Sequence, residues 1–448
     1  MGILGLGYRR PAYVDKDEFK KSHQEPPASP NPGSPDSIRS GRSSASAGIP
    51  DALTFDKIMN GGTCPPCTVR DFMNYLIYVE RSAENLQFFL WYRDYVKRFN
   101  DAKTSDISLA PEWTQTMEEE ALFKIQKEHA EKIRREPAVV GDIFKGTDFE
   151  KSQEPVVAEI RDPFGTPPQT PRENGSDFAP SNLVSIRSQV SDAFNAAGVK
   201  QPFTIQPFRE EIDRVIATYI MDDAPRQLNL SSKEQKAVLQ ALAYTTHPSA
   251  FRMVARSVES TLRQQAHPNF IRWSICNGNH ARVCFAWTLG MILVAAGFVL
   301  ALLLTLSSAP RGWRALAALG WLTGISTLVG AYKGMCVVLH GMHHRHVRPW
   351  ELFVDEEQLD EMSIVRKAGD KHSFDSFGSA NSYEDEPWIV RYERRNVVRK
   401  IFDREIWIQE PALRQIQDTI FVQSVLAALL GTGALTALFV AVPGGGFY

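Results

Sequence analysis

The stretch that decides the fold is CFAWTLGMILVAAGFVLALLLTL, which runs from Cys284 to Leu306 and contains no charged residue. These 23 residues, at about 1.5 Å of helical rise each, are long enough to cross a hydrocarbon core of roughly 30 Å. Two further apolar runs follow, and only Lys333 interrupts the first of them. We therefore expect three transmembrane helices, at 284–306, 315–339 and 419–442.

The basic residues next to these three runs predict an orientation. Nine Lys and Arg residues flank one side, namely Arg263, Arg272, Arg282, Arg345, Arg348, Arg399, Lys400, Arg404 and Arg414. The other side has only Arg311 and Arg314, in a short loop. Because basic residues are retained on the cytoplasmic side, we expect a cytoplasmic N-terminus and an extracellular C-terminus. The opening MGILGLGYRR is not expected to act as a signal peptide, so 284–306 would be an internal signal anchor.

The composition narrows the functional classes. The 448 residues hold 50 Lys and Arg against 52 Asp and Glu, a net charge of -2, so no overall field attracts nucleic acid. Five scattered cysteines do not form a disulfide framework. The apolar runs near the C-terminus exclude a purely soluble enzyme.

The polar part of the chain divides by composition. Pro- and Ser-rich sequence predicts a disordered N-terminal segment at 1–50 and a disordered insert at 141–202, because such sequence buries too little apolar surface to offset its ordering entropy. The segments between and after them, 51–140 and 203–273, show helical periodicity and no long alternation. They are predicted to form one all-α domain.

The strongest helical pattern begins at Thr68. Asp71 follows three residues later, the spacing of a capping box, and Phe72 and Leu76 then recur on one face. A second helix is expected to start at Ser82.

The sequence FMNYLIYVERSAENLQFFLWY, residues 72–92, resembles the central helices of a regulator of G-protein signalling (RGS) domain. The residues that carry the resemblance are Phe72, Leu76, Glu80, Ser82, Glu84, Asn85, Phe88 and Phe89. The later sequence Leu228-Asn229-Leu230-Ser231 resembles a turn of the same family, and its closing helices are matched by Pro248, Phe251, Val258, Leu262 and Phe270. The resemblance implies an RGS-like helical bundle, here followed by three transmembrane helices.

Domains of this family accelerate GTP hydrolysis by a heterotrimeric G-protein α subunit, and they do so by stabilising its switch loops. The resemblance implies that Glu84, Asn85 and Asn229 form the partner-binding surface, with no catalytic residue, cofactor or metal of the chain's own. For Glu84 and Asn85, a simple helix N-terminus is the alternative interpretation. Two positions depart from the family, since Gln265 stands where an Asp is usual and Asn269 where an Arg is usual.

An RGS-like domain with a Pro- and Ser-rich insert, followed by three spans, resembles the fungal Rax-type bud-site-selection and polarity proteins. This resemblance implies a plasma-membrane landmark or docking protein with a second polarity membrane protein as partner. The alternative is a GTPase-activating regulator of a Gα subunit. A transporter or channel is a third hypothesis, which three spans without an internal acid do not favour.

Two smaller motifs have competing interpretations. Cys64-Pro-Pro-Cys67 has redox spacing, but no strand pattern precedes it, so we interpret it as a loop leading into a helix. The histidines after the second apolar run, His340, His343, His344 and His346, are interpreted as an interfacial flank and not as a metal site.

The loop at 341–418 is predicted to be cytosolic and changes sign along its length. Acids dominate 351–386, and six bases face two acids at 391–404. Val397, Val398 and Phe402 interleave with those bases. An amphipathic segment on anionic lipid and an ordinary solvated helix are equally compatible with this pattern.

Overall fold

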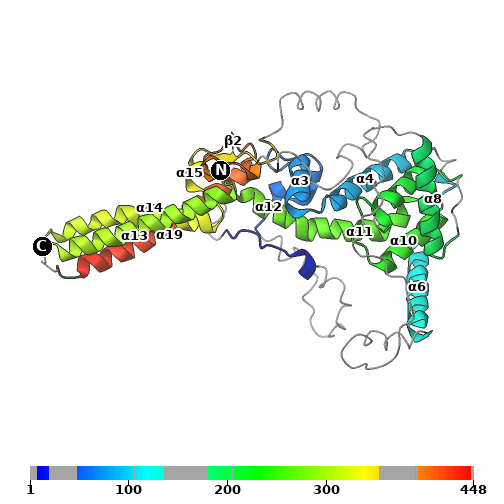
Figure 1. The fold of residues 1–448 in the computed structure, drawn as a ribbon, viewed down its shortest axis with the longest axis horizontal. Coiled ribbons are helices and arrows are strands. Elements are labelled where there is room, and N and C mark those ends of the chain that lie inside the picture. Colours follow the sequence, from blue (N-terminus) through cyan, green and yellow to red (C-terminus); the bar gives the residue numbers. More distant parts are fainter. Residues whose placement is uncertain are drawn as a thin grey trace, which may run out of the picture. The chain divides into compact units, whose positions relative to one another are not determined.

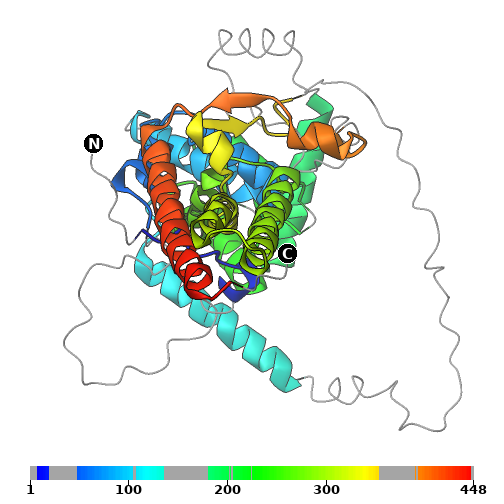
Figure 2. The same cartoon turned by 90° about the vertical axis from the view of Figure 1, so that its left-hand side faces the viewer.

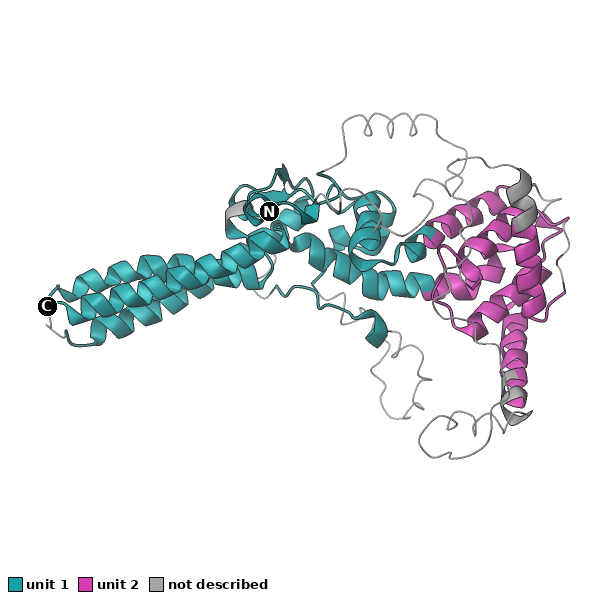
Figure 3. Ribbon diagram, in the orientation of Figure 1, with its two compact units in different colours: residues 1–87, 258–448 teal, residues 88–257 magenta. Residues whose placement is uncertain are grey.

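The computed structural model is mostly helical, with one small β-sheet among the residues that it describes (Figure 1). The described residues are 8–19, 48–103, 107–135, 180–200, 202, 205–222, 224–352, 389 and 392–444. The chain divides into two compact units, residues 1–87 with 258–448 and residues 88–257 (Figure 3). Helices α4 (Ala83–Asn100) and α11 (Arg252–Thr261) contribute residues to both units.

The unit formed by residues 88–257 has an aromatic core. Its other described elements are α6 (Gln115–Arg135), α8 (Pro180–Ala196), α9 (Arg209–Val215), η4 (Ile216–Ile220), α10 (Ser232–Tyr244) and η5 (Pro248–Phe251). Phe251 is fully buried, with its ring centroid 5.3 Å from that of Trp91 and 6.0 Å from that of Phe88. The buried Tyr95 stacks on Trp91 and donates a hydrogen bond to the carbonyl of Thr246. These contacts join α4 to the segment around η5.

The other unit combines a small helical part with the apolar helices. Its helical part comprises η2 (Asp51–Leu53), α2 (Phe55–Met59), α3 (Val69–Tyr75), η3 (Leu76–Glu80), η6 (Leu262–Ala266) and α12 (His267–Ile275). The predicted cap of α3 is confirmed. The Thr68 side chain accepts a hydrogen bond from the Asp71 backbone N–H, and the Asp71 carboxylate accepts one from the Thr68 backbone N–H. Phe72 and Phe270 are fully buried and pack with ring centroids 4.9 Å apart, which joins α3 to α12.

Among the described residues, three helices are long and apolar enough to cross a membrane, which makes this a multi-pass membrane protein by length and composition. They are α13 (His280–Leu306), the run of η7 (Arg311–Leu316) with α14 (Ala317–Tyr332), and α19 (Pro411–Ala441). The predicted second span, 315–339, differs most from the structure. A turn at Lys333 and Gly334 ends α14, with Gly334 at a φ of 79° that favours glycine, and α15 (Val337–Gly341) follows.

Four glycines allow α13 and α14 to pack backbone against backbone. A Cβ at Gly324 would lie 2.9 Å from the Gly290 carbonyl oxygen, and one at Gly320 would lie 3.0 Å from the Leu293 carbonyl oxygen. Gly297 faces the indole of Trp321, where a Cβ would lie 2.8 Å from the ring. Small residues at this crossing therefore bring the two helices close, as expected for packing inside a bilayer.

Trp321 joins all three long helices, which lie next to one another in the bundle and are seen nearly end-on in Figure 2. It is fully buried, with its ring centroid 5.4 Å from those of Phe298 on α13 and Phe439 on α19. At the same end Arg314 is 1% exposed and donates to the carbonyls of Phe439, at 2.8 Å, and Val442, at 2.6 Å. Arg314 thereby satisfies carbonyls that the end of α19 leaves without helical partners.

The structure differs from the sequence-based expectation in three further places. A two-stranded antiparallel sheet pairs β1 (His344–His346) with β2 (Glu405–Trp407), whereas the sequence predicted only helices. Strands of three residues are too short to show an alternating pattern in the sequence. Part of the predicted disordered insert forms α8, because Val190 and Phe194 are buried against neighbouring helices. Residues 8–19 of the predicted disordered segment 1–50 are ordered by hydrogen bonds that the next subsection describes. The acidic stretch 353–388 lies outside the described residues.

Replacing Gly324 by Ala is expected to destabilise the bundle by about 1–3 kcal/mol, because the added methyl group forces the α13 and α14 backbones apart. Thermal unfolding of the full chain in detergent, followed by tryptophan fluorescence, measures the effect. Gly433→Ala in α19 is the matched control, since its Cβ meets nothing within 4 Å. Equal melting temperatures for the two variants would refute the close crossing.

Candidate partner-binding surface

Two of the three predicted binding residues lie in the first turn of α4. Arg81 adopts a left-handed conformation, with φ 53°, and Ser82 is buried, so the chain turns sharply before Ala83. Glu84 and Asn85 follow and are partly exposed, with the Asn85 amide 3.4 Å from the Glu84 carboxylate. An acidic residue at this position also suits the positive end of the helix dipole.

Asn229 belongs to the other unit, in the loop before α10. Leu228 is buried and its N–H donates to the Tyr219 carbonyl at 2.8 Å, while Ser231 and Glu234 form a capping box at the start of α10. Asn229 lies between these anchors and is exposed. It is therefore held on a fixed turn with its side chain available to a partner.

Glu80 and Gln265 form a buried polar pair between η3 and η6. The Gln265 amide donates to the Glu80 carboxylate, and Gln265 is only 1% exposed. Burial raises the pKa of Glu80 above its ordinary value, although the bond from Gln265 opposes this shift. Gln265 therefore serves as an internal hydrogen-bond donor.

Asn269 is likewise engaged inside the unit. Its amide group binds the backbone of Val14 on both sides, since the Val14 N–H donates to Oδ1 at 2.9 Å and Nδ2 donates to the Val14 carbonyl at 2.8 Å. Asn269 is 2% exposed. Asn269 is therefore covered by the chain's own N-terminal segment.

We call residues 8–19 the N-terminal strap. Arg10 donates to the carbonyls of Lys333, at 3.0 Å, and Arg272, at 2.5 Å. Gln423 on α19 donates to the Tyr8 carbonyl at 3.0 Å, and Lys16 donates to the Glu80 carbonyl. The strap thus links η3, α12, the end of α14 and α19.

The Cys64–Cys67 segment has a structural role in this unit. The Cys64 N–H donates to the Glu410 carboxylate at 2.7 Å, and the Pro65 carbonyl accepts from the N–H groups of Gln409 and Glu410, both at 3.1 Å. Cys67 is fully buried, which raises the pKa of its thiol and opposes redox reactivity. The interpretation of a loop agrees with these contacts, and this loop binds the start of α19.

The histidines after α14 do not form one cluster. His340 and His343 approach the Asp418 carboxylate at 3.4 Å and 3.3 Å, whereas His344 and His346 lie on β1. Burial lowers the pKa of His346 to about 4, and Arg282 beside it adds to this effect. Within the part of the chain that the structure describes, no group of three or more His, Cys, Asp or Glu side chains is arranged to hold a metal ion.

Comparisons of the chain with models of protein families, with curated proteins and with solved structures give no match. What the geometry defines is the class, a multi-pass membrane protein that carries a helical domain.

Sequence analysis missed the residues that fasten the helical part to the membrane helices. The strap contains Arg9, Arg10 and Lys16, yet a few bases in a polar segment do not indicate docking. Asn269 and Gln265 were noted only as departures from the family. Their hydrogen-bond partners lie far away in the sequence, so local patterns give no signal for them.

Replacing Glu80 by Gln is expected to stabilise the protein near neutral pH, because Gln keeps an acceptor for Gln265 and removes a buried charge. A raised folded-state pKa means that wild-type Glu80 binds a proton more readily when folded. The advantage of the variant should therefore shrink as the pH falls through the raised pKa toward the ordinary value of 4.5.

Melting temperatures of the full chain in detergent, measured across this pH range, test the expectation. Glu128→Gln, at an exposed site on α6, controls for the loss of one carboxylate. A pH-independent difference between E80Q and wild type would show that Glu80 carries no buried charge.

Proposed function

We propose that this protein is a membrane-anchored docking protein in cell polarity, in which an RGS-like helical domain presents a binding surface next to the plasma membrane. The surface consists of Glu84, Asn85 and Asn229. Its partners are a second polarity membrane protein and, in the alternative, a heterotrimeric G-protein α subunit. The chain contributes no catalytic residue, so any effect on GTP hydrolysis would be exerted through the α subunit's own residues.

The observation that carries this proposal is the state of Gln265 and Asn269. Both side chains are almost completely buried. The Gln265 amide binds Glu80, and the Asn269 amide binds the backbone of Val14. In the RGS family the residues at these positions contact each other and a switch loop. An amide pair that is buried and already bonded supports binding without GTPase activation, since neither side chain is available to position a switch loop.

The connection to the bilayer supports a fixed position for the domain. Only Cys276 to Asn279 separate α12 from α13, and Gln417 on α19 donates to the Ile275 carbonyl at 3.1 Å. Asn277 also binds the Cys336 backbone from both amide atoms, at 2.7 Å and 3.1 Å. Glu84 and Asn85 belong to the same compact unit as this connection, which supports a position of these two residues near the membrane.

Single-turnover GTP hydrolysis by purified Gα subunits tests the choice between docking and activation, with the full chain in lipid nanodiscs. We expect no acceleration by wild type, and no difference from Glu84→Ala/Asn85→Ala. Acceleration that the double variant abolishes would establish the GTPase activator in place of the docking protein. The matched control is Lys233→Ala/Lys236→Ala, on the exposed face of α10.

Docking itself is tested in living cells of a polarised fungus with a fluorescent fusion of the full chain. We expect the wild type to concentrate at sites of growth and Glu84→Ala/Asn85→Ala/Asn229→Ala to spread over the plasma membrane at equal abundance. An unchanged distribution of the triple variant would remove these residues from the docking surface.

The proposed orientation has the N-terminus in the cytoplasm and the C-terminus outside. An epitope tag after Tyr448 should be stained by antibody on intact cells, and a tag before Met1 only after permeabilisation. Both tags staining only after permeabilisation would contradict either the orientation or the plasma-membrane location, and a surface-biotinylation control separates the two.

A further inference from the structure

A basic pocket lies next to the first transmembrane helix, in a segment that the proposed function does not use. Residues 392–404 contain five bases and two acids, and α18 (Val397–Ile401) occupies the middle of this segment. The pocket has a volume of about 530 Å³ and is lined by Arg394, Arg395, Asn396, Val398 and Arg399. Its size falls within the usual range for small-ligand sites.

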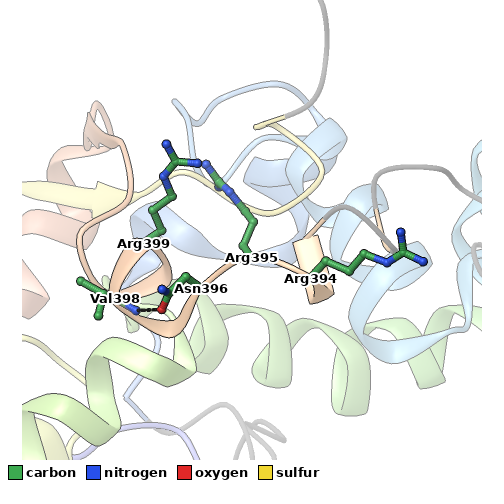
Figure 4. Close-up of a pocket in the computed structure, with 5 residues that line it drawn as sticks. All are labelled: Arg394, Arg395, Asn396, Val398 and Arg399. Atoms are coloured by element: carbon green, nitrogen blue, oxygen red, sulfur yellow. Dashed lines mark hydrogen bonds between the residues drawn. The ribbon is translucent and has the colours of Figure 1, made fainter.

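The arginines give the pocket its chemistry. Arg395 and Arg399 extend toward the same side of the ribbon, while Arg394 extends away from them (Figure 4). Asp403, only 5% exposed, binds Arg395 at 2.7 Å. Of the other acids in the described residues 392–405, Glu405 pairs with Arg282 at 2.7 Å, and Glu393 is exposed. Three arginines line the pocket, and Arg394 and Arg399 among them are exposed, so the lining is suited to a phosphate group.

Exposed apolar side chains lie in and just after the same segment. Val397 and Val398 are each 61% exposed, and Phe402 is 67% exposed. Trp407, on β2, is 50% exposed. Exposure of several large apolar side chains to water is unfavourable. Aromatic and aliphatic residues beside bases are instead typical of a membrane interface.

Several contacts hold this segment at one end of α13. The Phe402 ring lies 6.1 Å from that of Phe285 in α13, and the Asn279 amide donates to the Lys400 carbonyl at 2.5 Å. Arg282 binds both Glu405 and, at 2.9 Å, the ring of His346. The pocket is therefore positioned where a bilayer around α13 would present lipid headgroups.

We propose that this pocket binds the headgroup of an anionic phospholipid. Arg395 and Arg399 hold the phosphate, Arg394 contributes to the local field, and Val397, Val398 and Phe402 lie among the glycerol and upper acyl groups. Charge complementarity selects an anionic lipid over a zwitterionic one, and the exposed apolar side chains select a lipid over a soluble phosphate. The site does not depend on the proposed docking function.

Native mass spectrometry of the full chain in detergent tests the proposal, with equal amounts of phosphatidylserine and phosphatidylcholine added. Wild type should retain phosphatidylserine preferentially. Arg394→Gln/Arg399→Gln should weaken this binding about 30-fold, because each base near the surface contributes similarly to anionic-lipid binding. Lys233→Gln/Lys236→Gln removes the same number of charges from α10 and should leave the preference unchanged.

Two further measurements distinguish binding of a whole lipid from binding of a free phosphate group. Val397→Ser/Val398→Ser keeps every arginine and changes only exposed side chains, so it should lower phosphatidylserine retention without unfolding the protein. Inorganic phosphate at millimolar concentration should compete poorly with the lipid. The proposal is overturned if wild type shows no preference for phosphatidylserine, or if the Arg394/Arg399 variant and the Lys233/Lys236 control lose this preference to the same extent. It is also overturned if millimolar inorganic phosphate displaces bound phosphatidylserine.

Discussion

The close crossing of α13 and α14 is the constraint on which the membrane part of this protein depends. A bilayer supplies no water, so helices inside it associate through packing and through hydrogen bonds that they make themselves. Gly290 and Gly324 let the two backbones meet, and Trp321 fills the space that remains among the three helices. Arg314 then binds the end of α19, so a single arginine satisfies the carbonyls that the bundle would otherwise leave unpaired.

The helical part continues this arrangement because it is bonded to the bundle at several points. The N-terminal strap binds Asn269 and reaches Gln423, and the loop at Cys64 binds Glu410. Each contact joins segments that are hundreds of residues apart. These contacts use buried or partly buried side chains, so they fasten the helical part to the bundle from within.

Much of the fold follows from local patterns. Apolar runs of membrane-spanning length predicted three helices correctly, although the turn at Gly334 shortened the second one. The Thr68 capping box was also correct, because its two residues lie within one turn. The candidate site was less accessible. Its three residues came from a family resemblance, and the hydrogen-bond partner of Gln265 is Glu80, a residue distant in the chain.

By itself, the sequence determined the class of this protein, because hydrophobic length and charge-free composition act over a single contiguous segment. It also determined the caps and the helical periodicity of the polar part. Only the tertiary structure decided that β1 pairs with β2 and that residues 8–19 lie along the helical part. These features depend on hydrogen bonds and charges brought together from separate segments, and such pairings leave no periodic signal in the sequence.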